Sequence, residues 1–462
     1  MQRLIAPAFF LLLGAASIAC GGPDPNTSAR APIADKWFNR AKAAYRNGDL
    51  DDASAAIDGA LKAAPKDVES RLLASRIALA KLEYAEAIKL TEGLSDTDAR
   101  GIRGRAFWYA GDIDRAADEL EEMLRDPAVK DTWARDVAKL ARRGQGRHPF
   151  AIEGGVVASV EMPQAGPALV VPCELDGERV LALVATAMGE LMIDSTSRKE
   201  PAWVNLRFGE RLEVKDVPAL TTDLSNISRQ LGAPIKALLG VNALRHMHVT
   251  FDRRGSQFVV RKSDPPAPPD ANRVPLFYVR GGGMMMRASV SKQDDGSLLF
   301  VDSSAFYPLA LDDTMLKRSG ANLSTFQPQP GAPPTWKLGM LPYFKLGTLD
   351  LPEIPAMQGA PLADYKSNFD VDLGGVVGAG LLSAFRVTFG EDGRWLWLEL
   401  DPAVFSPQPQ ARPQPPVPGG TPPPGVAAPP SAPPDNTPAP VGPPKPPAKT
   451  DAPKTEGKGA AK

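Results

Sequence analysis

The stretch LLFVDSSAFYPLAL, residues 298–311, places one carboxylate, Asp302, in the middle of an otherwise apolar run. Apolar runs of this kind, rich in β-branched and aromatic residues, indicate a buried strand. A charge is costly to bury unless it is paired or hydrogen-bonded. Two hydroxyl residues and an alanine follow the acid directly. We therefore expect Asp302 either to take part in chemistry or to be held by hydrogen bonds from Ser303 and neighbouring amides.

The region around this stretch contains an internal duplication. The segments LLGVNALRHMHVTFDRRGSQFVV (238–260) and VVGAGLLSAFRVTFGEDGRWLWL (376–398) align without a gap. Gly240 then lies opposite Gly378, and both copies carry the same Val-Thr-Phe triplet. The sequence therefore predicts one lobe repeated twice.

The duplicated part of the chain is predicted to be all-β. From about residue 150, short strands alternate with turns rich in Gly, Pro and Asp. The proline-rich segment SDPPAPPDAN, 263–272, is expected to be a linker. It separates lobe 1, residues 150–262, from lobe 2, residues 273–402.

The order of motifs in each lobe resembles that of retropepsin-like and pepsin-like aspartic peptidases. FVDSSA occupies the family's Asp-Thr-Gly-Ala position in lobe 2. The resemblance implies two β-barrel lobes, with Asp302 as the catalytic-type aspartate and Ser303 as the hydroxyl residue after it. Gly378 in lobe 2 and Gly240 in lobe 1 would each end a segment of two hydrophobic residues and a glycine. The resemblance implies that this segment passes close beside the loop of the acid and supports it.

Lobe 1 departs from the family pattern at the acid. Counting from the hairpin glycine Gly177 places the aspartate position on Ala185 and the following glycine position on Ala187. A rival register through MIDSTS would instead use Asp194 as the second acid. The spacing from Gly177 favours Ala185 as a degenerate catalytic position, and the Asp194 register stays open.

The loss of one acid affects the expected chemistry. Aspartic peptidases use two carboxylates that share one proton, whereas a lone aspartate is ionised at neutral pH. Ser304 also replaces a glycine that lets the loops approach. The sequence therefore predicts a catalytically impaired body that binds polypeptides. The alternative is an active endopeptidase that takes its second acid from Asp194, or from Asp302 of another copy in a homodimer.

Residues 33–146 are predicted to form an α-solenoid of helical repeats. The unit ADKWFNRAKAAYRNGDLDDASAAIDGALKAAPKD resembles a tetratricopeptide repeat, with small alanines at helix contacts, Gly48 at the turn and Pro65 after the second helix. A second unit carries Leu82 where the turn glycine is expected, and a third restores Gly111. The resemblance implies a protein or peptide partner. A plain helical bundle is the competing interpretation.

The two ends of the chain indicate export and a flexible tail. Residues 1–19 have the layout of a signal peptide, and SIACGG resembles a bacterial lipobox that would make Cys20 a lipidated N-terminus, although Ser17 replaces the usual leucine. An ordinary secretory signal is the alternative. Residues 20–32 would be an anchor linker. Residues 403–462 are predicted to be a disordered proline-rich tail.

The residue after Cys20 is Gly21 and not the aspartate that retains some lipoproteins at the inner membrane. Attachment to the periplasmic side of the outer membrane is therefore favoured. The other cysteine, Cys173, is expected in the core.

The remaining signals argue against other function classes. Lys and Arg (53) nearly balance Asp and Glu (54), which gives no electrostatic case for a nucleic-acid partner. His246 and His248 are expected on one face of a strand, and with His148 they give no three-ligand metal pattern. The segment RGGGMMMRA lacks the end of a phosphate loop. No metal and no cofactor are predicted.

Overall fold

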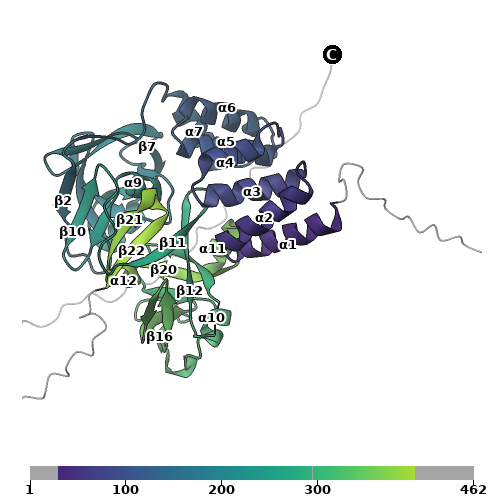
Figure 1. The fold of residues 1–462 in the computed structure, drawn as a ribbon. Coiled ribbons are helices and arrows are strands. Elements are labelled where there is room, and N and C mark those ends of the chain that lie inside the picture. The colour runs from purple at the N-terminus through teal and green to yellow at the C-terminus, as the bar shows by residue number, and fades with distance from the viewer. Residues whose placement is uncertain (1–29, 294, 401–462) are drawn as a thin grey trace, which may run out of the picture. The chain divides into compact units, whose positions relative to one another are not determined.

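The computed structural model describes residues 30–293 and 295–400, which form a set of helices followed by a β body (Figure 1). All described residues belong to one compact unit of the chain. The predicted signal peptide, Cys20 and the proline-rich tail lie outside the described residues. None of the helices in the described part is long and apolar enough to cross a membrane.

The helical region consists of consecutive antiparallel helices. Their bounds are α1 (Pro32–Arg46), α2 (Leu50–Ala63), α3 (Val68–Ala80), α4 (Tyr84–Thr91), α5 (Thr97–Tyr109), α6 (Ile113–Leu124) and α7 (Thr132–Arg142). An aspartate caps most of them by accepting a hydrogen bond from a first-turn amide, namely Asp49, Asp67, Asp96, Asp112 and Asp131. Fully buried alanines such as Ala41, Ala53 and Ala60 let α1 and α2 approach closely.

The turn between the two helices of each repeat requires a residue with a positive φ, in the left-handed region of backbone conformation. Gly48 (φ +72°) and Gly111 (φ +81°) supply it in the first and third units, as a glycine can without strain. In the second unit Leu82 adopts φ 60°. A non-glycine residue pays about 1–2 kcal/mol for this conformation. The Leu82 side chain is buried in the core of the β body, and that burial offsets the backbone cost.

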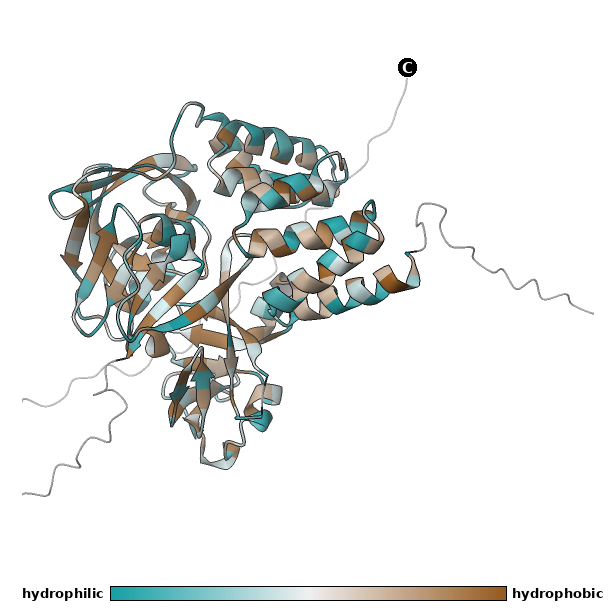
Figure 2. Cartoon of the chain, viewed as in Figure 1, coloured by the Kyte–Doolittle hydropathy of each residue, from teal (hydrophilic) through white to brown (hydrophobic). Residues whose placement is uncertain are grey.

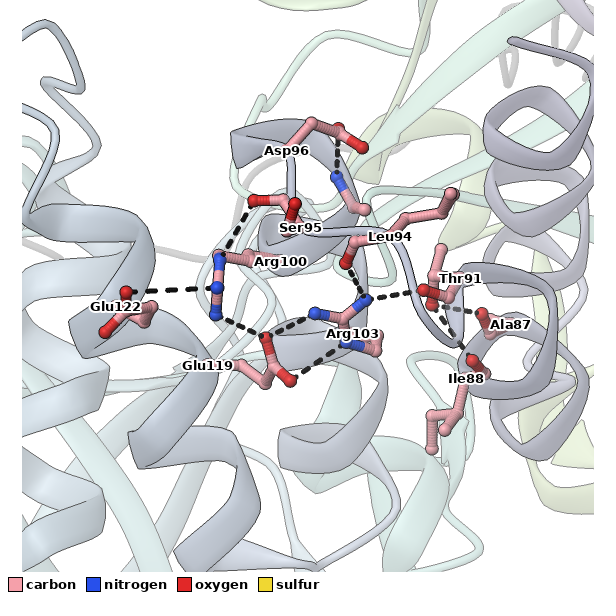
Figure 3. A network of polar contacts seen from close by, with 11 residues as sticks. Ala87, Ile88, Thr91, Leu94, Ser95, Asp96, Arg100, Arg103, Glu119 and Glu122 are labelled. Atoms are coloured by element: carbon pink, nitrogen blue, oxygen red, sulfur yellow. Dashed lines mark hydrogen bonds and ion pairs between the residues drawn. The ribbon is translucent and has the colours of Figure 1, made fainter. Parts of the chain in front are cut away.

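A buried arginine holds the third unit together (Figure 3). Arg103 donates two hydrogen bonds to the Glu119 carboxylate of α6, at 2.9 and 2.7 Å. Its remaining nitrogen donates to the carbonyls of Thr91 and Leu94, which close the end of α4. One guanidinium therefore satisfies a carboxylate and two backbone acceptors that the helix end leaves unpaired.

The strands of the two lobes follow in chain order. Lobe 1 contains β1 (Ala151–Gly154), β2 (Val157–Glu161), β3 (Val170–Leu175), β4 (Glu178–Val184), β5 (Leu191–Asp194), β6 (Ala202–Phe208), β7 (Leu212–Thr222), α8 (Ser225–Leu231), β8 (Ile235–Leu239), α9 (Val241–His246), β9 (Thr250–Asp252) and β10 (Gln257–Arg261). Lobe 2 contains β11 (Asn272–Val279), β12 (Gly283–Ser289), β13 (Ser297–Asp302), β14 (Leu309–Leu311), α10 (Asp313–Arg318), β15 (Gln327–Pro328), β16 (Lys337–Leu341), β17 (Phe344–Leu346), β18 (Leu349–Leu351), β19 (Ile354–Gln358), α11 (Leu362–Asn368), β20 (Leu373–Gly378), α12 (Ala379–Leu382), β21 (Phe385–Gly390) and β22 (Trp395–Leu400).

Strand pairing shows the same local arrangement in both lobes. In lobe 1, β8 lies between β4, to which it is parallel, and β5, to which it is antiparallel. In lobe 2, β20 lies in the same way between β13 and β14. The register pairs Val184 with Leu239 and Val301 with Val377, so the residue after each pair begins an equivalent loop.

The lobes also share a sheet and a core. Strand β9 of lobe 1 pairs with β21 of lobe 2, which continues the sheet in the order β11-β22-β21-β9-β10-β2. The hydroxyls of Thr250 and Thr388, buried on these two strands, lie 2.8 Å apart. Hydrophobic residues are frequent on the strands of both lobes (Figure 2), and residues of both lobes join one buried cluster. A shared sheet and a shared core therefore join the duplicated lobes.

The helical repeats pack against both lobes. Tyr45 of α1 contacts Phe277 of β11, with ring centroids 5.3 Å apart. On lobe 1, Trp108 of α5 contacts Trp203 of β6 at 5.9 Å, and Trp203 donates its indole hydrogen bond to the carbonyl of Leu140. Aromatic contacts at this spacing are typical of a packed interface. The repeats are therefore part of the same packed structure as the β body.

Replacing Arg103 with lysine is expected to lower the free energy of unfolding by about 2–3 kcal/mol, because a single ammonium cannot satisfy Glu119 and the two carbonyls together. Urea unfolding followed by circular dichroism measures the change. Arg76→Lys is the matched control, since Arg76 pairs with Asp98 at the surface and should cost less than about 1 kcal/mol. Equal losses in the two variants would contradict the role assigned to Arg103.

Candidate functional site

Asp302 lies at the carboxyl end of β13, between the apolar strands β12 and β20. Its neighbours along the strand, Phe300 and Val301, are buried, and the aspartate itself is only 5% exposed. The ladder with β12 ends at Phe300, and Asp302 itself pairs with Gly378 of β20. The carboxylate is therefore held rigidly at the place where the strand turns into its loop.

Four hydrogen bonds join this loop to its counterpart in lobe 1. The Thr186 amide donates to Ser303 Oγ at 3.0 Å, and the Ser303 amide donates to Thr186 Oγ1 at 3.0 Å. In addition, the Thr186 hydroxyl donates to the carbonyl of Val301 and the Ser303 hydroxyl donates to that of Val184, at 2.8 and 2.7 Å. Both hydroxyl residues are fully buried. Each loop thus supplies the partner that the other needs.

This reciprocal pairing relates the two loops residue by residue. Thr186 corresponds to Ser303, so Ala185 corresponds to Asp302 and Ala187 to Ser304. Ala185 is fully buried, and its amide donates to the carbonyl of Leu239. Where lobe 2 presents a carboxylate, lobe 1 presents a methyl group.

Both oxygens of Asp302 accept hydrogen bonds from lobe 2. Oδ1 accepts from the amide of Ser304 at 2.9 Å and from its hydroxyl. Oδ2 accepts from the phenol of Tyr365, on α11, at 2.8 Å. Burial raises the pKa of Tyr365 well above its usual value, and the charge of Asp302 adds to the rise. The phenol therefore stays protonated and serves as a permanent donor to the carboxylate.

A second tyrosine lies beside the same acid. Burial raises the pKa of Tyr307 to about 12, and the negative charge of Asp302 acts in the same direction. The aromatic ring of Tyr365 also packs on Phe300, with centroids 5.4 Å apart. Asp302 is therefore enclosed by aromatic groups and neutral donors. These contacts offer no second carboxyl group with which Asp302 could share a proton.

The supporting glycines allow backbone to pass close to each loop. A Cβ on Gly378 would lie 2.0 Å from the carbonyl oxygen of Tyr307, and one on Gly240 would lie 1.9 Å from that of Glu190. Any side chain at either position would clash with backbone. These glycines therefore allow the ends of β8 and β20 to pass close beside the two loops.

Asp194 lies at the end of β5, one strand beyond the lobe 1 loop. Its carboxylate pairs with Lys236 at 2.8 Å and accepts hydrogen bonds from Thr196. Burial opposes its ionisation, but the bonds from Lys236 and Thr196 prevail and lower the pKa of Asp194 to about 2. In lobe 2 the residue at the matching strand end is Asp312, which pairs with Lys366 at 2.6 Å. The hydrogen bonds of Asp194 lie within lobe 1 and do not reach Asp302.

A cleft of about 1720 Å³ runs between α1–α3 and lobe 2. Its lining combines aromatic and apolar residues, such as Phe38 and Phe369, with charges of both signs. Several of these charges pair across the cleft, among them Arg46 with Asp372 and Arg287 with Asp49. Lys366 of α11, the helix that supplies Tyr365, and Phe369, which follows this helix, both line the cleft.

Sequence reasoning did not find Tyr365, Tyr307 or the cleft. Tyr365 is 63 residues from Asp302 in the chain, and nothing in its local sequence points to an acid. Tyr307 follows the DSSA motif closely, and a bulky aromatic so near an acid was a signal that could have been used. The cleft depends on the packing of helices against a lobe, which no local pattern describes.

The prediction for the histidines is wrong in its secondary structure. His246 ends α9 and His248 lies in the following turn at φ 44°. His248 Nδ1 lies 2.8 Å from Asp264, whose other oxygen accepts from the amide of Asp392. Ligand atoms of these three residues lie within 4.8 Å of one another. Their mutual contacts connect the linker between the lobes to lobe 2.

Comparisons with known proteins bear on the fold. The tetratricopeptide repeat family model matches residues 38–94. No curated protein matches the chain in sequence.

Three solved structures are similar to parts of the chain. The Arabidopsis OM64 TPR domain is 16% identical, with a TM-score of 0.23, and covers 24% of this chain and 95% of its own. A retropepsin-like aspartic protease from Rickettsia conorii is 18% identical, with a TM-score of 0.21, and covers 28% of this chain and 90% of its own. Basic 7S globulin from soybean is 12% identical, with a TM-score of 0.35, and covers 54% of this chain and 95% of its own.

The expected fold class is confirmed for the described residues. Tetratricopeptide-like helical repeats come first, and a β-rich body that contains a barrel follows.

Proposed function

We propose that this protein is a lipid-anchored lipoprotein of the cell envelope whose aspartic-peptidase-like body binds polypeptides or protein partners without cleaving them. The observation that carries the proposal is the pairing of Thr186 with Ser303, which relates Ala185 to Asp302. The hydrogen-bonded loops that would align two carboxylates are present, but one of the two positions carries the methyl group of Ala185 instead of a carboxylate.

The missing acid removes the step that a peptidase of this kind needs. One carboxylate activates water while the other protonates the substrate carbonyl, and each role is worth about 10²–10⁴-fold in rate. In addition, Asp302 already accepts hydrogen bonds on both oxygens from Ser304 and Tyr365. A carboxylate engaged in this way supports the loop and has less capacity to activate water.

The binding role draws on the helical repeats and the cleft beside them. Tetratricopeptide repeats generally mediate contacts between proteins, and this chain places α1–α3 along one wall of the large cleft. Apolar side chains interleaved with charges of both signs suit an extended polypeptide, because backbone and side chains can both find partners. We therefore assign the cleft as the surface for the polypeptide.

The purified protein is expected not to cleave a fluorescein-labelled unfolded casein at any pH between about 3 and 7, the range in which a shared-proton pair operates. Asp302→Asn should leave binding of the same casein within twofold, as measured by fluorescence anisotropy. Ala185→Asp, which restores an acid, is the matched control for gain of activity. Acid-optimum cleavage that Asp302→Asn abolishes would overturn the binding proposal.

The active-peptidase alternative needs a second acid, and Asp194 is its candidate within the chain. The Lys236 ion pair gives Asp194 a structural role instead. Because its pKa is lowered from the usual 3.8 to about 2, its contribution to stability is present above about pH 4 and is lost as the pH falls towards 2.

Asp194→Asn is therefore expected to lower the free energy of unfolding by about 2 kcal/mol at pH 7, with the difference from the natural protein shrinking below about pH 4. Urea titrations at pH 7, 4 and 3 measure it. Glu210→Gln, an exposed acid in the same lobe, is the control and should change little. A loss of proteolysis in Asp194→Asn without a loss of stability would support the peptidase instead.

The anchoring part of the proposal rests on the sequence alone. The SIACGG motif puts Cys20 at a lipobox position after an apolar stretch of signal length. Lipid chains bury about 0.8 kcal/mol per CH₂, so several chains on one cysteine hold a protein firmly in a bilayer. Gly21 favours the periplasmic side of the outer membrane.

Cys20→Ala is expected to move the protein from the membrane fraction to the soluble fraction, or to leave the unprocessed precursor. Fractionation of cells followed by immunoblotting measures the distribution. Cys173→Ala removes the other cysteine, which is buried in lobe 1, and should leave the distribution unchanged. Persistent membrane attachment of a processed Cys20→Ala protein would refute lipidation at this position.

A further inference from the structure

Three side chains able to bind a metal ion meet where the two lobes and the linker come together. His248 lies in the turn after α9 of lobe 1, Asp264 lies at the start of the linker, and Asp392 lies in the 3₁₀ turn η2 (Glu391–Gly393) of lobe 2. A ring nitrogen of His248 and one carboxylate oxygen of each aspartate lie within 4.8 Å of one another. None of the three lines the large cleft, so the cluster is separate from the surface assigned to polypeptides.

Hydrogen bonds hold the three residues together. His248 Nδ1 lies 2.8 Å from Asp264 Oδ1, and Asp264 Oδ2 accepts from the amide of Asp392 at 2.8 Å. The side chain of His248 is 13% exposed and that of Asp264 is 33% exposed. The Asp264 carboxylate is therefore fixed between a turn of each lobe, with the imidazole largely shielded from solvent.

The backbone of both turns also fixes the positions of the side chains. His248 has φ 44° and Asp392 has φ 54°, both in the left-handed region. A residue with a Cβ persists in this conformation only where the surrounding structure holds it there. The ligand atoms are therefore brought together by the fold and not by chance rotation of surface side chains.

The cluster carries more negative charge than its imidazole can balance. The two carboxylates contribute two negative charges when ionised, and a protonated imidazole contributes one positive charge. Arg261 lies close by, but its guanidinium donates to the carbonyl of His248 and to the hydroxyl of Thr250. Like charges at such short range repel one another. A divalent cation among the three groups would balance both carboxylates.

The donor atoms select the class of metal. Zn²⁺ accepts imidazole nitrogen together with carboxylate oxygen, whereas Ca²⁺ and Mg²⁺ take oxygen ligands. At bond lengths of about 2.0–2.2 Å, neighbouring ligands of one ion lie about 3.0–3.4 Å apart. His248 Nδ1 and Asp264 Oδ1 are already close to that spacing. Asp392 is exposed, so its carboxylate can turn toward the ion.

We propose that His248, Asp264 and Asp392 bind one Zn²⁺, with water completing its shell, and that the ion fastens the linker to both lobes. Nδ1 binds the metal as a neutral imidazole whose proton is on Nε2. The ion then takes the place of the hydrogen between Nδ1 and Oδ1. The site is independent of the proposed function, because none of its three residues touches Asp302 or lines the cleft.

The test is a calorimetric titration of the full chain with ZnCl₂, after metal has been removed with EDTA and dialysis. The natural protein is expected to bind Zn²⁺ saturably and more tightly than Mg²⁺ or Ca²⁺. Tighter binding of Mg²⁺ or Ca²⁺ would overturn the assignment of a nitrogen ligand. Absence of Zn²⁺ binding at every concentration at which the protein stays in solution would leave only a hydrogen-bonded His248–Asp264 pair, and would overturn the proposal.

Two matched pairs of variants locate the ion. His248→Gln should weaken Zn²⁺ binding at least about tenfold, since loss of even an outer-shell partner typically costs about 10–100-fold. His148→Gln removes an exposed histidine and should change nothing. Asp392→Asn should also weaken binding, whereas Asp270→Asn, at an exposed aspartate with a similar backbone (φ 63°), should not. Equal affinity in natural protein, His248→Gln and Asp392→Asn would place the metal elsewhere and overturn the proposal.

A measurement on the natural protein keeps the question open to test if a variant does not fold. With histidine labelled by ¹⁵N, Zn²⁺ should shift the Nδ1 signal of one of the three histidines. Binding without any histidine shift would overturn the proposal.

The fastening role is tested by limited proteolysis. Trypsin cleaves after Lys262, which is exposed at the end of lobe 1 directly before the linker. Zn²⁺ should slow this cut severalfold in the natural protein and leave its rate unchanged in His248→Gln, which also controls for any effect of the metal on trypsin. An unchanged rate in the natural protein with Zn²⁺ bound would overturn the fastening role.

Discussion

The reciprocal hydrogen bonds between Thr186 and Ser303 are the constraint on which the arrangement of the two lobes depends. Each hydroxyl is fully buried and can be satisfied only by the loop of the other lobe. Leaving either group unpaired would cost the full desolvation of a buried polar group. The bonds therefore hold two loops, more than 100 residues apart in the chain, in one relative position.

This frame is independent of the acid that it would align. The pairing uses the hydroxyl residues and backbone groups next to the acid position, so aspartate can be replaced by alanine in lobe 1 without loss of any of the four bonds. In lobe 2 the remaining acid accepts from Ser304 and Tyr365. A buried carboxylate with this number of donors is structurally satisfied, which explains how a single acid persists in an apolar setting.

The helical repeats are tied into the same body through lobe 1. Glu190, which follows the loop of Ala185 and Thr186 closely, accepts from Trp108 of α5. The close approach of Gly240 to the Glu190 backbone places α9 and Asn242 beside the same contact. One short segment of lobe 1 therefore takes part in both the lobe junction and the contact with the repeats. The helical repeats and the β body are accordingly linked by direct packing.

The sequence by itself determined the elements whose signals are local. The repeated spacing of small alanines, Gly48 and Pro65 predicted the helical repeats, and the duplicated Gly240 and Gly378 segments predicted two related lobes, because each pattern is set by neighbours in the chain. Spacing from Gly177 also singled out Ala185. The expected strand at His246 and His248 was wrong, since alternation over three residues does not separate a strand from a helix end followed by a turn.

Only the tertiary structure decided which distant groups meet. Tyr365 reaches Asp302 across 63 residues, and Trp108 reaches Glu190 across 82. The shared sheet through β9 and β21 likewise joins strands from different lobes. Such contacts arise from the packing of whole elements, and a hydrogen bond between remote side chains imposes no periodicity or spacing on the sequence that carries it.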